Sequence, residues 1–125
     1  LLEDATVPRS KLADTFAEIE RLTEKYQLKV GTFGHAGDDN LHPTVLCDER
    51  DEDEMKRAHA FYDELYEQVL AWGGTVSGEH GIGVAKKEFL ARQIGPGGVD
   101  VMRRIKNAFD PKGLLNPGKI IDGKQ

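Results

Sequence analysis

The stretch VGTFGHAGDDNLHPTVL, at residues 30–46, decides the fold of this chain. Its two ends, Val30–Phe33 and Leu41–Leu46, follow the pattern of short β-strands. Between them, Gly37–Asn40 consists of residues that tolerate left-handed backbone angles, which is a hairpin signal. We therefore expect an antiparallel hairpin in the first half of the chain.

Helices are predicted on both sides of this hairpin. Apolar residues recur at helical spacing over Ser10–Tyr26, with Ser10 as the N-cap, and again along a stripe from Met55 to Trp72. Thr75–Ser77 follows as a short strand. A third helix is expected from about Val84 to Ile94, where Gly95-Pro96 stops it, and a fourth carries Val99–Phe109.

This order of elements predicts an α+β fold, with helices packed on one face of a small antiparallel sheet. The tail Lys112–Gln125 is rich in turn residues, so we expect an irregular arm after the last helix. With 125 residues, one compact domain over residues 1–125 is expected. Because the chain begins Leu1-Leu2-Glu3, without an initiator methionine, we treat it as a piece of a larger protein.

Composition excludes several classes of protein. The chain has 22 acidic and 17 basic side chains, a net charge of −5, and no basic block, so a nucleic-acid-binding surface is not expected. A single cysteine, Cys47, cannot form an internal disulfide. The longest uncharged run, Gln68–Gly78, is far shorter than the roughly 20 residues that span a bilayer. No signal peptide is recognisable, and we expect a cytoplasmic protein.

Three of the four histidines lie in glycine-rich loops beside carboxylates. A tight hairpin brings His35 and His42 to the same end of the sheet, and Glu79 lies on a separate loop just past the short strand. Two histidines and one carboxylate with open positions form a known type of divalent metal site. The alternative is structural: the histidines hydrogen-bond local backbone and Glu79 caps a neighbouring helix.

Other chemistries find less support in the residues. The glycines at 81 and 83 open a helix, but Lys86 replaces the third glycine of a dinucleotide-binding fingerprint. Ser77 lacks a nucleophile elbow. Cys47 lies among acidic residues, which raise a thiol pKa, so it is interpreted as a buried residue at a strand end.

Three motifs resemble those of one known family, the C-terminal domains of FAD-linked oxidases. GHAGDDNLH at residues 34–42 is similar to the family's G-H-x-G-D-G-N-L-H, and SGEHGIG at residues 77–83 matches its second motif. FDPKGLLNPGK at residues 109–119 is similar to its closing motif. The family includes the glycolate oxidase large subunit, D-lactate dehydrogenase and D-2-hydroxyglutarate dehydrogenase.

The resemblance implies a ferredoxin-like domain that covers a flavin and supplies the substrate pocket. FAD would be bound mainly by an N-terminal domain absent from this chain, and the first half of the cap is absent as well. In the relatives that resemble the 2-hydroxyglutarate enzyme, residues corresponding to His35, His42 and Glu79 bind a divalent metal, here zinc, manganese or iron. The residue corresponding to His80 is the base that takes the substrate hydroxyl proton.

The closing motif implies that Asn116 and Lys119 contact the cofactor. One departure is Asp39, where the family has glycine; a left-handed angle there costs more with a side chain. From the residues themselves, Asn40 can orient a metal ligand or the substrate through its amide. Arg9 can pair with a substrate carboxylate.

The hypothesis is a domain of an FAD-dependent enzyme that oxidises a 2-hydroxy acid of the glycolate or D-lactate type to the 2-oxo acid. The expected partners are that small molecule, the FAD-binding domain of the parent chain and further oxidase subunits. The isolated chain is expected to be inactive. Two alternatives stay open: a non-catalytic ferredoxin-like binding or regulatory domain, and a stand-alone metal-dependent hydrolase in which His80 or Glu79 activates water.

Overall fold

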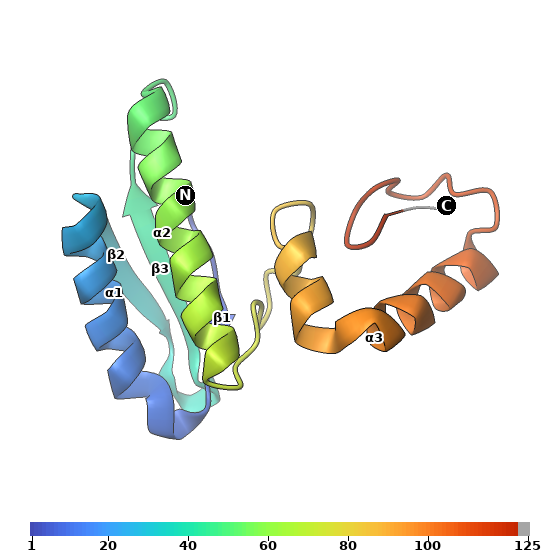
Figure 1. Ribbon diagram of the computed structural model, residues 1–125, viewed down its shortest axis with the longest axis horizontal. Coiled ribbons are helices and arrows are strands. Elements are labelled where there is room, and N and C mark those ends of the chain that lie inside the picture. The colour runs from blue at the N-terminus through green and yellow to red at the C-terminus, as the bar shows by residue number, and fades with distance from the viewer. Residues whose placement is uncertain (123–125) are drawn as a thin grey trace. The chain divides into compact units, whose positions relative to one another are not determined.

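The computed structural model describes residues 1–122 of the chain (Figure 1). Contacts divide the chain into two compact units, Leu1–His80 and the part from Gly81 onward. Each unit has its own helical segments. No helix among residues 1–122 is long and apolar enough to cross a membrane.

The first unit is built on a three-stranded antiparallel sheet with strand order β1-β3-β2. Its elements, in chain order, are β1 (Ala5–Thr6), the 3₁₀ turn Arg9–Lys11, α1 (Leu12–Tyr26), β2 (Lys29–His35), the 3₁₀ turn Ala36–Asp38, β3 (Asn40–Leu46) and α2 (Glu52–Ala71). After α2 the chain returns to the sheet, where Thr75 forms an isolated antiparallel bridge with Thr6. This is the β-α-β-β-α-β arrangement of a ferredoxin-like fold, and the predicted α+β class is confirmed.

The predicted hairpin is present and longer than expected, because β2 extends to His35 and β3 starts at Asn40. In its register Phe33 lies opposite His42, and His35 lies opposite Asn40. Asp39 closes the turn with φ 57°, a left-handed angle that Asp tolerates better than most residues. The predicted strand at Thr75–Ser77 is reduced to the single bridge at Thr75.

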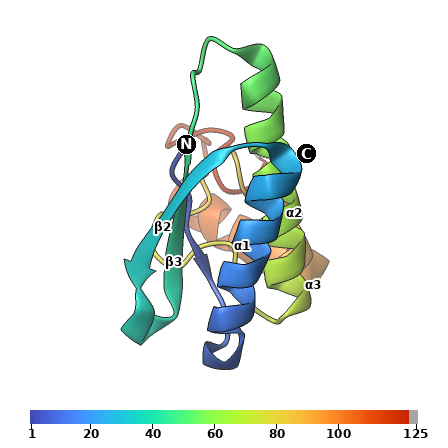
Figure 2. The same ribbon diagram turned by 90° about the vertical axis from the view of Figure 1, so that its left-hand side faces the viewer.

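Both helices of this unit cover one face of the sheet (Figure 2). Their apolar stripes meet that face: Leu22 of α1 and Phe61 and Leu65 of α2 are almost fully buried, as is Val45 of β3. Burying a side chain of this size contributes about 1.5–3 kcal/mol. The core of the unit therefore lies between the two helices and the sheet.

The ends of the helices show how the sequence sets their bounds. Asp51 caps α2, because its carboxylate accepts hydrogen bonds from the backbone N–H groups of Asp53 and Glu54. The sequence predicts Ser10 as the N-cap of the first helix, and this prediction is wrong. Ser10 lies within the 3₁₀ turn that follows Pro8, and α1 starts at Leu12. Proline holds the backbone extended at that point, so the cap position moves along the chain.

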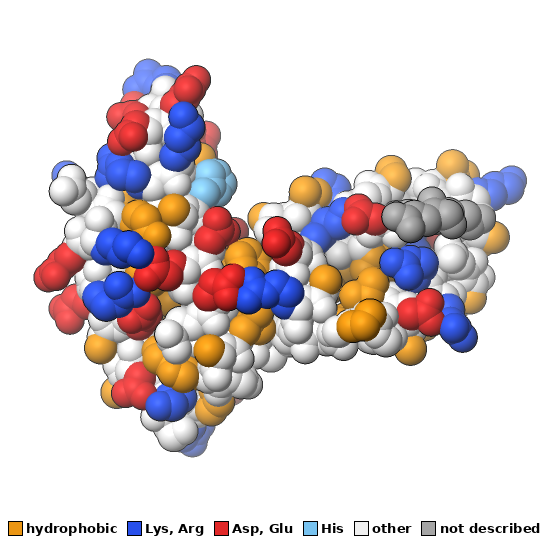
Figure 3. Space-filling view, in the orientation of Figure 1, with side chains coloured by type: hydrophobic (Ala, Val, Ile, Leu, Met, Phe, Trp, Pro, Cys, Tyr) orange, Lys and Arg blue, Asp and Glu red, His pale blue; other side chains and the backbone are white. Residues whose placement is uncertain are grey.

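The second unit contains α3 (Lys87–Phe109), which covers the two helices that the sequence predicts, one from about Val84 to Ile94 and one carrying Val99–Phe109. The first of them begins at Lys87 rather than at Val84. The backbone of Gly95 is non-helical (φ 69°, ψ 174°), so α3 consists of two helical segments that meet at a kink. The predicted break at Gly95-Pro96 is therefore confirmed as this kink. Apolar side chains stay at the surface of this unit and show as orange atoms in Figure 3, with Phe109 84% exposed and Leu114 71% exposed.

Candidate functional site

The hairpin places two histidines at one end of the sheet. His35 closes β2 and His42 lies two residues into β3, so the tight turn between them brings both rings to the same end. Their centroids are 5.3 Å apart and the rings meet edge to face. The His35 side chain is 60% exposed, whereas that of His42 is 5% exposed. One imidazole thus faces solvent and the other lies in the wall of the site.

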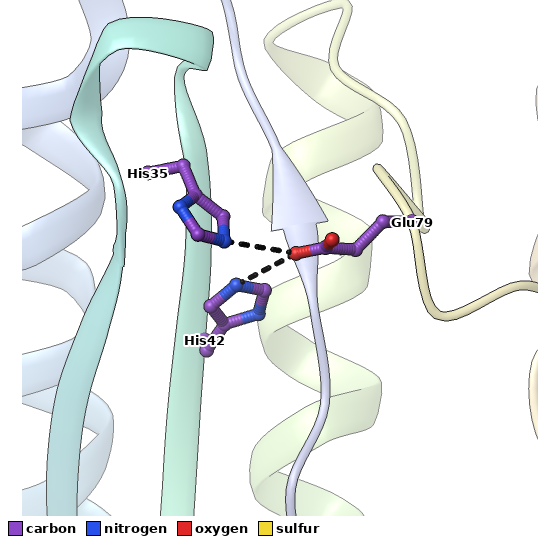
Figure 4. Close-up of side chains that lie close together, drawn as sticks. All are labelled: His35, His42 and Glu79. Carbon is purple, nitrogen blue, oxygen red and sulfur yellow. Dashed lines mark ion pairs between the residues drawn. The ribbon is translucent and has the colours of Figure 1, made fainter.

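Glu79 joins the two histidines from the loop that follows the Thr75 bridge (Figure 4). A single oxygen, Oε1, lies 3.3 Å from Nε2 of His35 and 3.0 Å from Nε2 of His42. The ligand atoms of the three residues all lie within 4.8 Å of one another. The structure therefore brings together the three residues in which the sequence predicts metal ligands.

Asn40 holds the carboxylate of Glu79. Its amide Nδ2 donates a hydrogen bond to Oε1 of Glu79 at 3.1 Å. Its Oδ1 accepts one from the hydroxyl of Thr6 at 3.3 Å, which fixes which end of the amide faces Glu79. Of the two roles that the sequence suggests for Asn40, the geometry favours orientation of a metal ligand.

His80 stacks on His42, with ring centroids 4.8 Å apart and the planes 10° from parallel. Phe33 contacts the His42 ring as well, at a centroid distance of 5.4 Å. Nδ1 of His42 is buried and has no hydrogen-bond partner among the described residues. These contacts set the orientation of the His42 ring so that Nε2 is the nitrogen presented to Glu79.

Asp4 is a site residue that sequence reasoning missed. Its carboxylate is fully buried, and one oxygen, Oδ2, accepts hydrogen bonds from the backbone N–H groups of residues 78–80 and from the Ser77 hydroxyl. Its other oxygen lies 3.8 Å from Nδ1 of His80. The signal in the sequence is weak: an acidic residue directly before the short stretch Ala5–Val7, with no pattern that links it to a loop more than 70 residues later.

The remaining predicted residues lie in other contacts. Arg9 pairs with Asp39 at 3.2 Å and donates to the carbonyl of Gly37 at 2.7 Å, so it ties the start of the first helical turn to the hairpin. Asn116 and Lys119 belong to the second unit. There they line an apolar groove of about 440 Å³ beside α3, and Asn116 has a left-handed backbone with φ 46°.

The donor set has the chemistry of a divalent metal site. Two imidazole nitrogens and a carboxylate oxygen are ligands that zinc, manganese and iron accept. Ligand atoms around a tetrahedral zinc with bonds of about 2.0–2.1 Å lie about 3.3 Å apart. Here Oε1 of Glu79 lies 3.3 and 3.0 Å from the two imidazole nitrogens, and all three ligand atoms lie within 4.8 Å of one another. A cation in this position would leave further coordination sites open beside His80, where a small molecule could bind.

Comparisons with known proteins show the family of the chain. The family described as "FAD linked oxidases, C-terminal domain" matches residues 1–120. The glycolate oxidase subunit GlcD of Bacillus subtilis is 47% identical over 120 residues, which cover 96% of this chain and 26% of that protein. A D-lactate dehydrogenase of Anaerostipes hadrus is 41% identical over 118 residues, covering 94% of this chain and 25% of that protein. The chain thus spans about a quarter of the length of these relatives.

Proposed function

The chain belongs to the family of FAD-linked oxidase C-terminal domains, and we propose that it is the substrate-binding side of an enzyme that oxidises a 2-hydroxy acid to the 2-oxo acid. The observation that carries the proposal is the meeting of His35, His42 and Glu79 on one point beside His80. Relatives named for glycolate and for D-lactate supply the substrate class.

We assign His35, His42 and Glu79 as ligands of a divalent cation, zinc, manganese or iron. Such a cation supplies Lewis-acid polarisation, which lowers the pKa of a hydroxyl group that it contacts. The protein holds the ligands ready for it: the hairpin register sets the two imidazoles, and Asn40 fixes the carboxylate of Glu79.

His80 is the proposed base. Its ring lies on His42 and is one-third exposed, so a substrate that reaches the three ligands also meets this imidazole. His80 would accept the hydroxyl proton while a hydride leaves the carbinol carbon. A positioned base of this kind contributes about 10²–10⁴-fold to the rate. FAD, bound mainly by the rest of the parent protein, supplies the hydride acceptor.

The proposal also gives roles to the other residues that the sequence singles out. Asn40 orients Glu79 and borders the substrate, Arg9 offers a guanidinium to a substrate carboxylate, and Asn116 and Lys119 face the cofactor. The partners proposed are the FAD-binding domain and, since the Bacillus subtilis relative is named a subunit, further oxidase subunits in the cytoplasm. Without the FAD-binding domain this chain is expected to be inactive.

The test has two arms, and the first is metal content. The purified chain is exposed to zinc, manganese and iron, dialysed and analysed by elemental mass spectrometry, with the His35→Ala/His42→Ala double variant as control. We expect about one equivalent in the parent chain and none in the variant. Equal metal in both, or none in the parent, would contradict the assignment of the ligands.

The second arm tests the oxidation. This chain replaces the corresponding quarter of the Bacillus subtilis relative, and dye reduction by glycolate and D-lactate is measured. We expect activity that falls about 10²–10⁴-fold in His80→Ala. The control is His59→Ala. His59 is exposed on α2, so its replacement should leave the rate unchanged. Undiminished activity in His80→Ala would exclude His80 as the base. Ester hydrolysis by the metal-loaded chain alone would favour the alternative of a stand-alone hydrolase.

A further inference from the structure

We propose that Asp4 is a positioning residue for the site. It fixes the backbone of the loop that carries Glu79 and His80. This inference deepens the proposed function and rests on it for the identity of the ligands. Asp4 is not itself placed to bind the cation, because its Oδ2 already accepts hydrogen bonds from that loop.

The contact between Asp4 and the loop is concentrated on one atom. Oδ2 lies 2.8 Å from the amide nitrogen of Gly78, 2.7 Å from that of Glu79 and 3.0 Å from that of His80, and it is 3.2 Å from the Ser77 hydroxyl oxygen. Successive backbone N–H groups turned toward one point form a cradle for an anion. Here a side chain of the same protein occupies the cradle.

Burial makes this contact strong. Asp4 is fully buried, and a carboxylate there needs hydrogen bonds to offset the loss of its hydration. Hydrogen bonds to a charged acceptor are stronger than those between neutral groups. The loop of residues 78–80 lies beyond the sheet, because strand pairing in this segment ends with the Thr75 bridge. Asp4 therefore replaces the missing strand contacts.

The loop held in this way contains the groups that the chemistry requires. Glu79 must place Oε1 between two imidazoles of the hairpin, and His80 must stack on His42. Both side chains start from amides that Asp4 binds directly. Asp4 itself lies next to β1, which pairs with β3, so it couples the loop to the strand that carries His42. Partners that orient ligands in this manner typically affect metal affinity by about 10–100-fold.

The experiment compares matched variants of two capping carboxylates in the purified chain. Asp4→Ala removes the acceptor, and Asp4→Asn keeps an oxygen in its place without the charge. Asp51→Ala and Asp51→Asn are the controls. Asp51 also accepts hydrogen bonds from two backbone N–H groups, but these belong to the start of α2 and not to the loop of residues 78–80. Zinc affinity is measured by calorimetry, and unfolding is followed for every variant.

We expect Asp4→Ala to weaken zinc binding by about 10–100-fold, Asp4→Asn by about 3-fold, and both Asp51 variants to bind as the parent does. Equal loss in the Asp4 and Asp51 variants, or none in any, would overturn the proposal, because it would leave Asp4 with a general stabilising role or no role. If Asp4→Ala does not fold, unchanged zinc affinity in Asp4→Asn is by itself enough to overturn the proposal.

A readout without metal separates this inference from the proposed function. If the parent chain binds no zinc, hydrogen exchange measured by NMR still reports on the amides of residues 78–80. These amides should be protected in the parent and exposed in Asp4→Ala, and the His80 ring resonances should shift as the ring leaves His42. Protection that persists in Asp4→Ala would refute the positioning role whatever the metal result.

Discussion

At the scale of single residues, the site depends on how closely the backbone at Gly78 approaches its neighbours. A Cβ at this position would lie 2.4 Å from the Thr6 hydroxyl oxygen and 2.7 Å from Cγ of Asn40. Asn40 donates a hydrogen bond to the carboxylate of Glu79, and Thr6 donates one to the Asn40 side chain. Glycine is therefore required here by space, and any side chain would push directly on the Asn40 amide that orients Glu79.

We predict that Gly78→Ala destabilises the fold by about 1–3 kcal/mol and reduces zinc affinity, because the added methyl displaces the Asn40 amide. Thermal unfolding and calorimetry of the variant measure both effects. Gly31→Ala is the matched control: Gly31 lies in β2, and a Cβ there meets no atom within 4 Å. Equal behaviour of the two variants would show that the close approach at Gly78 is not needed.

At the scale of elements, α1 and α2 are joined by a cluster around Glu64. Its carboxylate accepts hydrogen bonds from Arg21 at 2.7 Å, from the Tyr26 hydroxyl at 2.8 Å and from Lys25. These bonds lower the pKa of Glu64 to about 2, with Lys25 the largest contributor. Exposed ion pairs contribute little singly, about 0.2–1 kcal/mol, but here three partners from one helix meet a single carboxylate of the other.

The sign of the pH effect follows from this lowered pKa. Unfolded chains protonate Glu64 near its ordinary pKa of about 4.3, whereas the folded protein keeps it ionised down to about pH 2. The stabilisation is therefore complete above about pH 5 and is lost as the pH falls toward 2. We expect Glu64→Gln to lower stability at pH 7 by about 1 kcal/mol and to flatten this part of the pH profile.

Urea unfolding at several pH values between 2 and 7 tests this prediction. Glu20→Gln serves as the control, because Glu20 is an exposed glutamate on α1 outside the cluster. Its pH profile should follow that of the parent. A Glu64→Gln profile as steep as the parent's would mean that another acidic group causes the loss of stability at low pH.

At the scale of the whole molecule, buried apolar side chains are unevenly distributed. The first unit buries a continuous core between its two helices and the sheet, including Leu22, Phe61 and Val69. In the second unit α3 buries Phe89 and Leu90, while several large apolar side chains are exposed. The exposed ones are Val84, Val101, Ile105, Phe109, Leu114, Leu115 and Ile120.

We predict that the two units differ in local stability in the isolated chain. Amide hydrogens in peptides from α2 should exchange slowly, at rates set by global unfolding, and those from α3 and the arm after it should exchange faster. Hydrogen exchange followed by mass spectrometry measures this difference, with dilution as the control for self-association. Equal protection of α2 and α3 at every concentration would contradict the prediction.

Local patterns in the sequence were enough to predict most elements. The hairpin, the two helices of the first unit and the break at Gly95 all depend on interactions between near neighbours: apolar periodicity, turn residues and glycine. The errors have the same origin. Ser10 and Val84 looked like helix starts in isolation, but α1 begins at Leu12 after the Pro8 turn and α3 begins at Lys87.

The sequence by itself therefore determined the α+β class, and it determined that His35 and His42 share one end of a hairpin, because only seven positions separate them and the turn between them is encoded locally. It also contained the motifs by which the family can be identified. Only the tertiary structure decided that Glu79 meets both rings, that His80 stacks on His42 and that Asp4 holds their loop. These contacts join residues about 40 to 75 positions apart, and they form only when burial of the helices against the sheet brings those segments together.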